Sequence, residues 1–139
     1  MDFSSTSRRA AATALALLRS RGTLTLAHAQ PDINFAALGR PGLDAIYSTG
    51  RDALLRELES ELRERLGPAR DVVIDSLVLH GDASEALLAH VKEGSYDLIS
   101  AGTAGLASSD FHDMGSVSTA LLRGASCAVL ITPRAETSP

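Results

Sequence analysis

The chain has 139 residues, 45% of them apolar, which is enough for one domain with a single substantial core. Its formal net charge of -4 without a visible basic patch argues against a nucleic-acid-binding protein, and the absence of a run of ~18 apolar residues argues against a membrane span. The single cysteine, Cys127, excludes a disulfide framework or a zinc cluster and favours a reducing, cytoplasmic location.

The first third of the sequence predicts a helix, a strand and an irregular connection. Residues 4–22 begin with serines that can cap a helix and end at Gly22, a good helix stop. Arg19 and Arg21 follow the alanine-rich part where a signal peptide needs small residues, so an amphipathic helix is favoured. Residues 23–29 predict a strand. Residues 30–46 contain two prolines and two glycines and predict a long connection.

Residues 47–67 give the clearest helix signal. Leucines at helical spacing form an apolar stripe, made of Leu54, Leu58 and Leu62 and widened by Leu55 and Leu66. Acidic residues precede arginines by four positions in the pairs Asp52–Arg56, Glu59–Arg63 and Glu61–Arg65. Such pairs are typical of a solvated helix face, so we expect no binding site there.

The second half alternates strands with helices. Strands are predicted over residues 72–81, 96–102 and 127–133, and a helix over residues 115–124. Another helix, over residues 82–94, has Asp82 and Glu85 in capping-box spacing and Gly94 as its stop. The alternation predicts an α/β fold with a single open, mostly parallel twisted sheet and helices on both faces. We expect one domain over residues 1–134 and a loose tail over residues 135–139.

A glycine-rich segment over residues 102–118 begins at the carboxyl end of a predicted strand, where ligands of such folds bind. Gly102 and Gly105 would let the backbone approach a phosphate closely, because glycine has no Cβ. Gly115 and Ser116 begin a helix whose free N–H groups favour an anion. The alternative is that the first two glycines merely turn the chain and that the last pair is an ordinary N-cap.

The glycine spacing resembles the nucleotide loop of the universal stress protein family: Gly102, two residues, Gly105, nine residues, then Gly115 and Ser116. The likeness spans essentially the whole chain. Residues 115–133 resemble the last helix and strand of that family, residues 24–30 its second strand, and residues 2–4 the turn after its first strand. The resemblance implies a five-stranded parallel sheet, a stress-responsive regulatory role without demonstrable catalysis, and a homodimer through the last strand, here Cys127 to Thr132.

The resemblance also implies a ligand. In nucleotide-binding members, the turn after the first strand meets the adenosine, the end of the second strand lies near the base, and the glycine loop lines ribose and phosphates. ATP or a related adenine nucleotide, with or without Mg²⁺, is therefore expected to contact the matching residues, which are Asp2, Ala29, Ala101, Gly102, Gly105, Gly115, Ser116 and Val117. No catalytic constellation is expected beyond slow ATP hydrolysis at most.

The loop departs from the family pattern in its charge. Leu106 stands where nucleotide-binding members often carry a basic or polar residue, and Asp110 and Asp113 add negative charge. Two carboxylates near a triphosphate cost affinity unless Mg²⁺ or an outward orientation relieves the repulsion. The alternative function is a dimeric protein-interaction module of the same fold that does not bind nucleotide.

The family's central first strand has no counterpart before Asp2, since only Met1 precedes it. We expect the strands over residues 23–29 and 96–102 each to lose a pairing partner or to close directly on each other. We also expect the sequence to be a truncated form whose start was assigned at an internal methionine.

Other residues favour structural roles. His28 ends a strand, where a hydrogen bond to the backbone is commoner than catalysis. His112, between Asp110 and Asp113, is expected in a solvated loop rather than a metal site. A P-loop enzyme needs a Gly-Lys-Ser/Thr motif, but the only lysine, Lys92, lies on a predicted capped helix. A receiver domain is favoured less, because residues 132–134 offer no lysine after the last strand.

Overall fold

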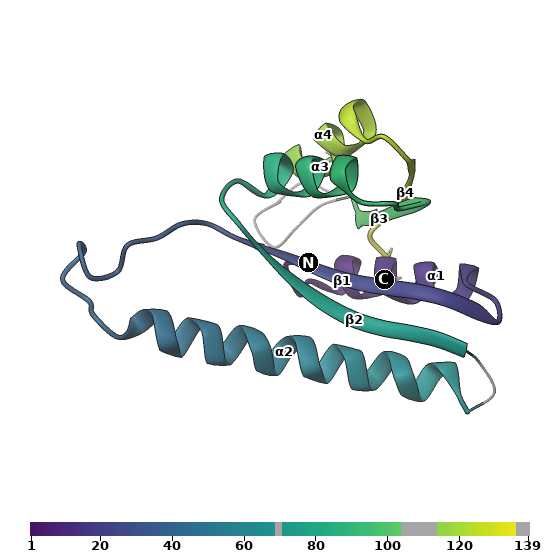
Figure 1. Cartoon of the computed structure of the whole chain (residues 1–139), viewed down its shortest axis with the longest axis horizontal. Helices are drawn as coiled ribbons and strands as arrows, with labels where there is room; N and C mark the ends of the chain where they lie inside the picture. The colour runs from purple at the N-terminus through teal and green to yellow at the C-terminus, as the bar shows by residue number, and fades with distance from the viewer. Residues whose placement is uncertain (69–70, 104–113, 136–139) are drawn as a thin grey trace.

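The structure, a computed structural model, describes residues 1–68, 71–103 and 114–135, in which helices and strands alternate (Figure 1). The elements are α1 (Ser5–Leu17), β1 (Arg21–Gln30), α2 (Leu43–Leu66), β2 (Asp71–His80), α3 (Ala83–Glu93), β3 (Leu98–Gly102), α4 (Ser116–Gly124) and β4 (Ala128–Thr132). This order confirms the predicted α/β fold. Of the predicted tail, residues 136–139 lie outside the described residues.

The described strands form two parallel pairs. β1 pairs with β2 from Arg21 opposite Asp71 onward, and β3 pairs with β4 from Leu98 opposite Ala128 onward. Among the described residues no strand joins β1 to β3, so the continuous sheet that we expected is divided in two. Of the two outcomes expected without a central strand, the loss of a pairing partner is the one observed. α1 packs against both pairs.

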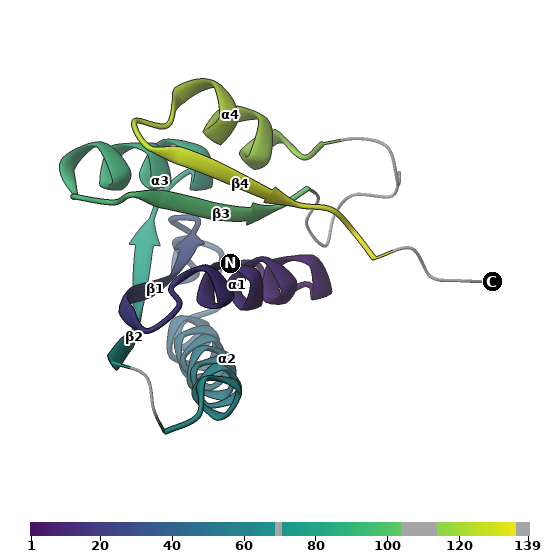
Figure 2. The same ribbon diagram turned by 90° about the vertical axis from the view of Figure 1, so that its right-hand side faces the viewer.

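The helices form a layer on each side of the strands (Figure 2). α1 contacts β1, β3, β4 and α2, whereas α3 and α4 pack against each other on the opposite side. The main core lies where α1 and α2 meet β1 and β2, and its fully buried side chains include Leu26, Leu58, Leu62 and Ile74. A second, more open interior lies between β1 and β3, and it contains the candidate site.

The end of α1 differs from the prediction. The helix stops at Leu17, and Arg19 has a φ of 46°, so the chain turns there without a glycine. Gly22 instead lies inside β1 with a φ of 140°. A Cβ at this position would lie 2.8 Å from Cδ2 of Leu18. Gly22 therefore serves the close passage of the new strand past the end of the helix.

The predicted caps and ion pairs are largely confirmed. The side chain of Ser4 caps α1 by accepting from the Ser7 N–H, and Asp82 caps α3 by accepting from the Ser84 and Glu85 N–H groups. Two of the three predicted pairs on α2 form, between Glu59 and Arg63 at 2.6 Å and between Glu61 and Arg65 at 2.9 Å. The third does not, because Asp52 pairs with its neighbour Arg51.

The leucine stripe of α2 needs one correction. The buried leucines of this helix are Leu55, Leu58 and Leu62, whereas the side chain of Leu54 is exposed. The helix also begins at Leu43, earlier than predicted, because the irregular connection ends at Gly42. No helix in the described ranges is long and apolar enough to cross a membrane.

Candidate functional site

A cavity of about 680 Å³ lies between β1 and β3. α1 lines it from one side, and α3 and the start of α4 line it from the other. The carboxyl ends of β1 and β3 meet the same N-terminal segment, since Met1 bonds to Ala27 and Thr6 packs against Gly102. In a parallel α/β fold this end of the strands is where ligands bind. The cavity therefore includes the position expected for a site, and we call this end of it, lined by Asp2, Ala29, Gly102, Ser116 and Val117, the cavity mouth.

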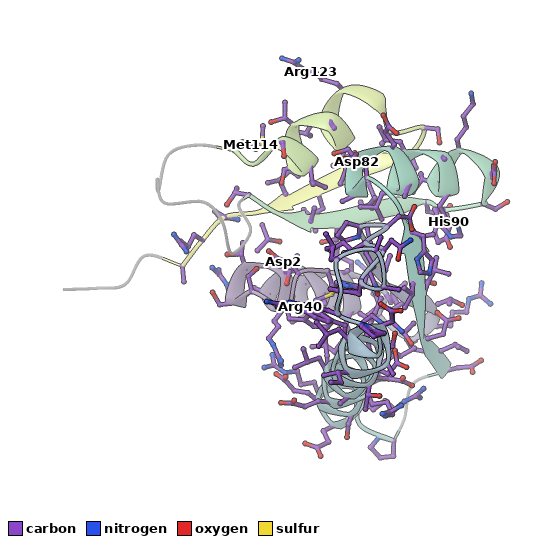
Figure 3. The ribbon with its side chains drawn as sticks, turned by 90° about the vertical axis from the view of Figure 1, so that its left-hand side faces the viewer. Asp2, Arg40, Asp82, His90, Met114 and Arg123 are labelled. Carbon is purple, nitrogen blue, oxygen red and sulfur yellow. The ribbon has the colours of Figure 1, made fainter. Side chains whose placement is uncertain are left out.

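Asp2 lies at the start of α1, on the cavity wall (Figure 3). Its carboxylate accepts hydrogen bonds from the Ser4 N–H at 3.1 Å and from the Ser4 hydroxyl at 2.7 Å. Ser4 is itself the N-cap of α1, so the position of Asp2 is fixed by the start of the helix. A carboxylate held in this way presents an acceptor to a ligand hydroxyl or amine in the cavity.

The end of β1 carries Ala29, which lines the cavity next to His28. His28 Nδ1 donates a hydrogen bond to the carbonyl oxygen of Met1, and its ring packs against Phe3 with centroids 5.1 Å apart. Burial lowers the pKa of His28 below its ordinary value of 6.5. The hydrogen bond to Met1 raises the pKa, but the effect of burial is larger. The predicted structural role of His28, bonded to backbone, is confirmed.

The end of β3 is tied to the start of α4. The Ser118 hydroxyl donates to the carbonyl oxygen of Gly102 at 2.5 Å, and the Gly115 N–H donates to the carbonyl oxygen of Thr103 at 2.6 Å. Ser118 is buried, so its hydroxyl serves the fold and is not available to a phosphate. These two bonds place the N-terminus of α4 beside the carboxyl end of β3.

Gly102 has a packing reason to be glycine. A Cβ there would lie 2.5 Å from Cγ2 of Thr6 and 3.2 Å from its carbonyl carbon. Contacts this short force the helix or the strand to move. Gly102 thus allows α1 to approach β3 closely, whatever it also offers to a ligand.

Gly115 is the N-cap of α4, with extended φ and ψ and no side-chain cap bond. The first N–H groups of any α-helix lack a partner within the helix, and the helix dipole adds positive potential there. Ser116 and Val117 supply these groups, and both residues line the cavity together with Ala101. In the described part of the wall, this helix start and the amino group of Met1 are the features that attract an anion.

The charge of the wall is low. Among the described lining residues, no lysine or arginine is present and Asp2 is the only acidic residue. Gly105, Leu106, Asp110, His112 and Asp113 lie outside the described residues, so the predictions made for them remain predictions. In the described ranges, no three His, Cys, Asp or Glu side chains converge as metal ligands would.

Of the eight predicted contact residues, seven line this one cavity: Asp2, Ala29, Ala101, Gly102, Gly115, Ser116 and Val117. The sequence reasoning missed the parts that hold them in place. Ser118 carried a usable signal, since small hydroxyl residues at a helix start often bond to nearby backbone. Thr6 acts through the packing of its methyl group against Gly102, which the sequence does not signal. Met1 carried none, because its bonds to β1 depend on the tertiary fold.

The structural comparisons place the fold among known proteins. The hypothetical protein MJ0577 aligns with a TM-score of 0.81 at 18% identity, over 99% of this chain and 94% of that one. Universal stress protein UspA from Lactobacillus plantarum aligns with a TM-score of 0.67 at 20% identity, over 93% and 92% of the two chains. A universal stress protein solved in complex with cAMP aligns with a TM-score of 0.59 at 24% identity, over 97% and 93%.

A search of curated proteins gave no match. The sequence model of the universal stress protein family matches residues 1–133, which include every described element and the cavity between β1 and β3. The parallel α/β fold and the match over nearly the whole sequence agree, and the chain belongs to the universal stress protein family.

Proposed function

We propose that this protein is a cytoplasmic, stress-responsive regulator that binds ATP or a related adenine nucleotide at the cavity mouth. The observation that carries the proposal is the meeting of three features there: the open N-terminus of α4, the fixed carboxylate of Asp2, and the small residues at the ends of β1 and β3. Membership of the family and a relative in complex with cAMP support an adenine nucleotide as the ligand.

The chemistry of the wall fits the parts of a nucleotide. Asp2 offers an acceptor that a ribose hydroxyl can use, and Ala29 leaves room for a flat base beside β1. The N–H groups of Ser116 and Val117 would take a phosphate, as helix N-termini do in many phosphate sites. The small side chain of Ala101 leaves the end of β3 accessible next to them.

Charge decides which nucleotide is favoured. The described wall offers no lysine or arginine to balance a triphosphate; its basic groups are His28, His90 and the amino group of Met1, and Asp2 adds one negative charge. Mg²⁺ carried by the nucleotide would lower the charge that the site must accept. We therefore propose that ATP binds as its Mg²⁺ complex and that a cyclic monophosphate, with a single charge, needs no metal.

We propose no catalytic role for the described cavity residues. His28 is held between Met1 and Phe3, and Ser118 is committed to Gly102. A nucleophile with an adjacent base is what covalent chemistry needs. The nucleotide is proposed as a signal that the protein senses, with hydrolysis slow at most.

Calorimetric titration with Mg²⁺ and ATP, ADP, cAMP or GTP tests the proposal. Ser116 is exposed at the first position of α4, so Ser116→Asp keeps the helix start favourable while it repels a phosphate. We expect this variant to bind ATP more than tenfold more weakly than wild type, a loss above ~1.4 kcal/mol. Ser116→Asn, which adds similar bulk without charge, should bind like wild type. Absence of heat at millimolar nucleotide would leave the dimeric interaction module as the function.

A further inference from the structure

The outer edge of β2, on the side away from β1, has no strand beside it among the described residues. In Figure 1, β2 lies between β1 and α2, so this edge is on the side of the long helix. An unpaired edge presents a row of backbone N–H and C=O groups, to which a strand of another molecule can add. The side chains and segments that cover these groups therefore decide whether two molecules can associate there.

Alternate residues of β2 direct their backbone groups to the outer edge. The N–H groups of Asp71 and Gly81 both donate towards β1, so the odd-numbered residues of the strand face β1. The even-numbered residues between positions 72 and 80 consequently direct N–H and C=O outward. The carbonyl group of Ile74 agrees with this pattern, because its hydrogen bond comes from a side chain of α2.

Arg63 of α2 covers the first half of the edge. Its Nη2 donates a hydrogen bond to the carbonyl oxygen of Ile74 at 2.7 Å. Glu59, one turn earlier on the helix, holds the guanidinium by accepting from Nε at 3.2 Å and from Nη2 at 2.6 Å. An added strand would need the Ile74 carbonyl as an acceptor and would also have to displace or desolvate the guanidinium. Arg63 therefore opposes strand addition at this position.

The connection between β1 and α2 covers the other end of the edge. Asp32 Oδ1 lies 3.6 Å from His80 Nδ1, and residues 30–35 line one small hollow together with His80. Between this cover and Arg63, only Ser76 and Val78 direct backbone groups outward. Two outward-facing residues give an added strand few hydrogen bonds to exchange for those it makes with water.

We infer that Arg63 is an edge guard, a side chain that prevents β2 of one copy of this chain from pairing with β2 of a second copy. Without its guanidinium, the outward groups of residues 72–78 form one continuous edge. The guard acts through a contact between α2 and β2 and involves neither the cavity nor β4. The inference is therefore independent of the proposed nucleotide binding.

A second copy is the partner that this edge fits once the guard is removed. Two β2 strands related by a two-fold axis run antiparallel. In the register centred on Ile74, Asp75 lies opposite Val73 of the other copy and Asp71 lies opposite Leu77. No two carboxylates of β2 then face each other, which like charges in directly opposed positions would disfavour. The side chain of Val73 is 53% exposed and would gain a neighbour.

The test compares two arginines of α2 that differ in one contact. Arg63 and Arg65 each pair with a glutamate one turn earlier and are 51% and 58% exposed, but of the two only Arg63 bonds to β2. Methionine keeps the helix propensity and removes the charge and the donors. In light scattering at rising protein concentration and without nucleotide, Arg63→Met should reach at least twice the mass of wild type. Arg65→Met should keep the wild-type mass, and equal masses of the two variants would overturn the inference.

Hydrogen exchange locates the new contact. In Arg63→Met, a rise in protein concentration should slow exchange at the amides of Ser76 and Val78, which face outward. The amides of Val73 and Asp75 should change little, because they face β1. Protection confined to β4 would place the association at the other outer strand and would overturn the inference.

Two further variants separate loss of the guard from misfolding. Arg63→Lys keeps a charged side chain at the edge and should retain the wild-type mass. The double variant Arg63→Met and Ser76→Lys places a charge on the strand itself and should return the mass to that of wild type. A raised mass that persists in the double variant would mean that the copies associate elsewhere. Should circular dichroism show that Arg63→Met is unfolded, Arg63→Gln, whose side chain is shorter, replaces it and is compared with Arg65→Gln.

Discussion

The hydroxyl of Ser118 donates a hydrogen bond to the carbonyl oxygen of Gly102 at 2.5 Å, and so joins the start of α4 to the end of β3. A second, longer bond of 3.3 Å reaches the carbonyl oxygen of Thr103. Two segments that are separated by the glycine-rich loop in sequence therefore meet through one buried side chain. The proposed phosphate contacts, Ser116 and Val117, lie on the first turn of the same helix.

We expect Ser118→Ala to destabilise the protein by about 1–3 kcal/mol, because it leaves a buried carbonyl group without its donor. Chemical denaturation at constant pH measures this loss. Nucleotide affinity should fall as well, since the start of α4 is no longer fixed. Ser126→Ala is the matched control, because the Ser126 hydroxyl makes only a long 3.5 Å bond to Val91. Equal stability of the two variants would contradict a structural role of Ser118.

Gly102→Ala should destabilise the fold through Thr6, and not only weaken a ligand. The added Cβ would lie 2.5 Å from Cγ2 of Thr6, so the predicted cost is about 1–3 kcal/mol. Thr6→Ser removes that methyl group and should recover part of the loss in the double variant. A double-mutant cycle of unfolding free energies measures the coupling, and purely additive effects would show that the two residues do not clash.

The pKa of His28 predicts how stability changes with pH. Burial lowers this pKa below 6.5, so the unfolded chain binds the proton more tightly than the folded one. The contribution of His28 to the free energy of unfolding is therefore complete above pH 6.5. It is lost as the pH drops from 6.5 towards the lower pKa of the folded state. Burial also lowers the pKa of the Met1 amino group from 8.0, which gives the same sign at higher pH.

Thermal unfolding of wild type and His28→Gln isolates the contribution of the imidazole. The measurements run from about pH 5 to about pH 8, a range that brackets the ordinary histidine pKa of roughly 6.5. The variant should lose the part of the slope below pH 6.5 and keep the part that belongs to Met1. Parallel stability curves for the two proteins would show that His28 titrates alike in the folded and unfolded states.

Metal dependence separates the nucleotides by charge. Since the described wall offers Asp2 and no lysine or arginine, removal of Mg²⁺ with a chelator should weaken the binding of ATP at least tenfold, or ~1.4 kcal/mol. Affinity for cAMP should change less than twofold. Calorimetry with both ligands gives the comparison, and an equal response of ATP and cAMP to Mg²⁺ would contradict the proposed charge balance.

Homodimerisation through β4 remains a proposal with a direct test. β4 pairs with β3 on one edge, and Val129 and Ile131 are only partly buried. We expect the double variant Val129→Lys and Ile131→Lys to convert a dimer to a monomer in light scattering. Leu122→Lys, on the exposed face of α4, should keep the dimer mass. A dimer mass that survives in the β4 variant, with unchanged circular dichroism, would place the interface elsewhere.

The local signals in the sequence predicted the helices and strands well. Asp82 and Gly94 bound α3 as their spacing indicated, and Gly115 begins α4. The errors came from tertiary packing. Gly22 was interpreted as a helix stop, but the helix ends earlier at Leu17, and the glycine serves the passage past Leu18. Leu54 continued the leucine spacing, but the neighbouring Leu55 faces the core.

The candidate site was predictable only in its outline. The glycine spacing indicated which strand end and which helix start meet, and Ala101 and Ser116 do line one cavity. The sequence could not show that Gly102 is required by Thr6, because this contact joins α1 to β3 across the fold. The resemblance predicted that a central strand is missing, but it left open whether β1 and β3 would lose a partner or close on each other. Their separation, and the depth and lining of the cavity between them, required the structure.

An NMR titration of the amide resonances with Mg²⁺ and ATP tests the central claim, nucleotide binding at the cavity mouth, most directly. We predict saturable shifts at Ala29, Gly102, Ser116 and Val117, which line the mouth, and none at Leu58 in the core under α2. The absence of shifts at millimolar nucleotide, or shifts concentrated on residues that do not line this cavity, would contradict the claim.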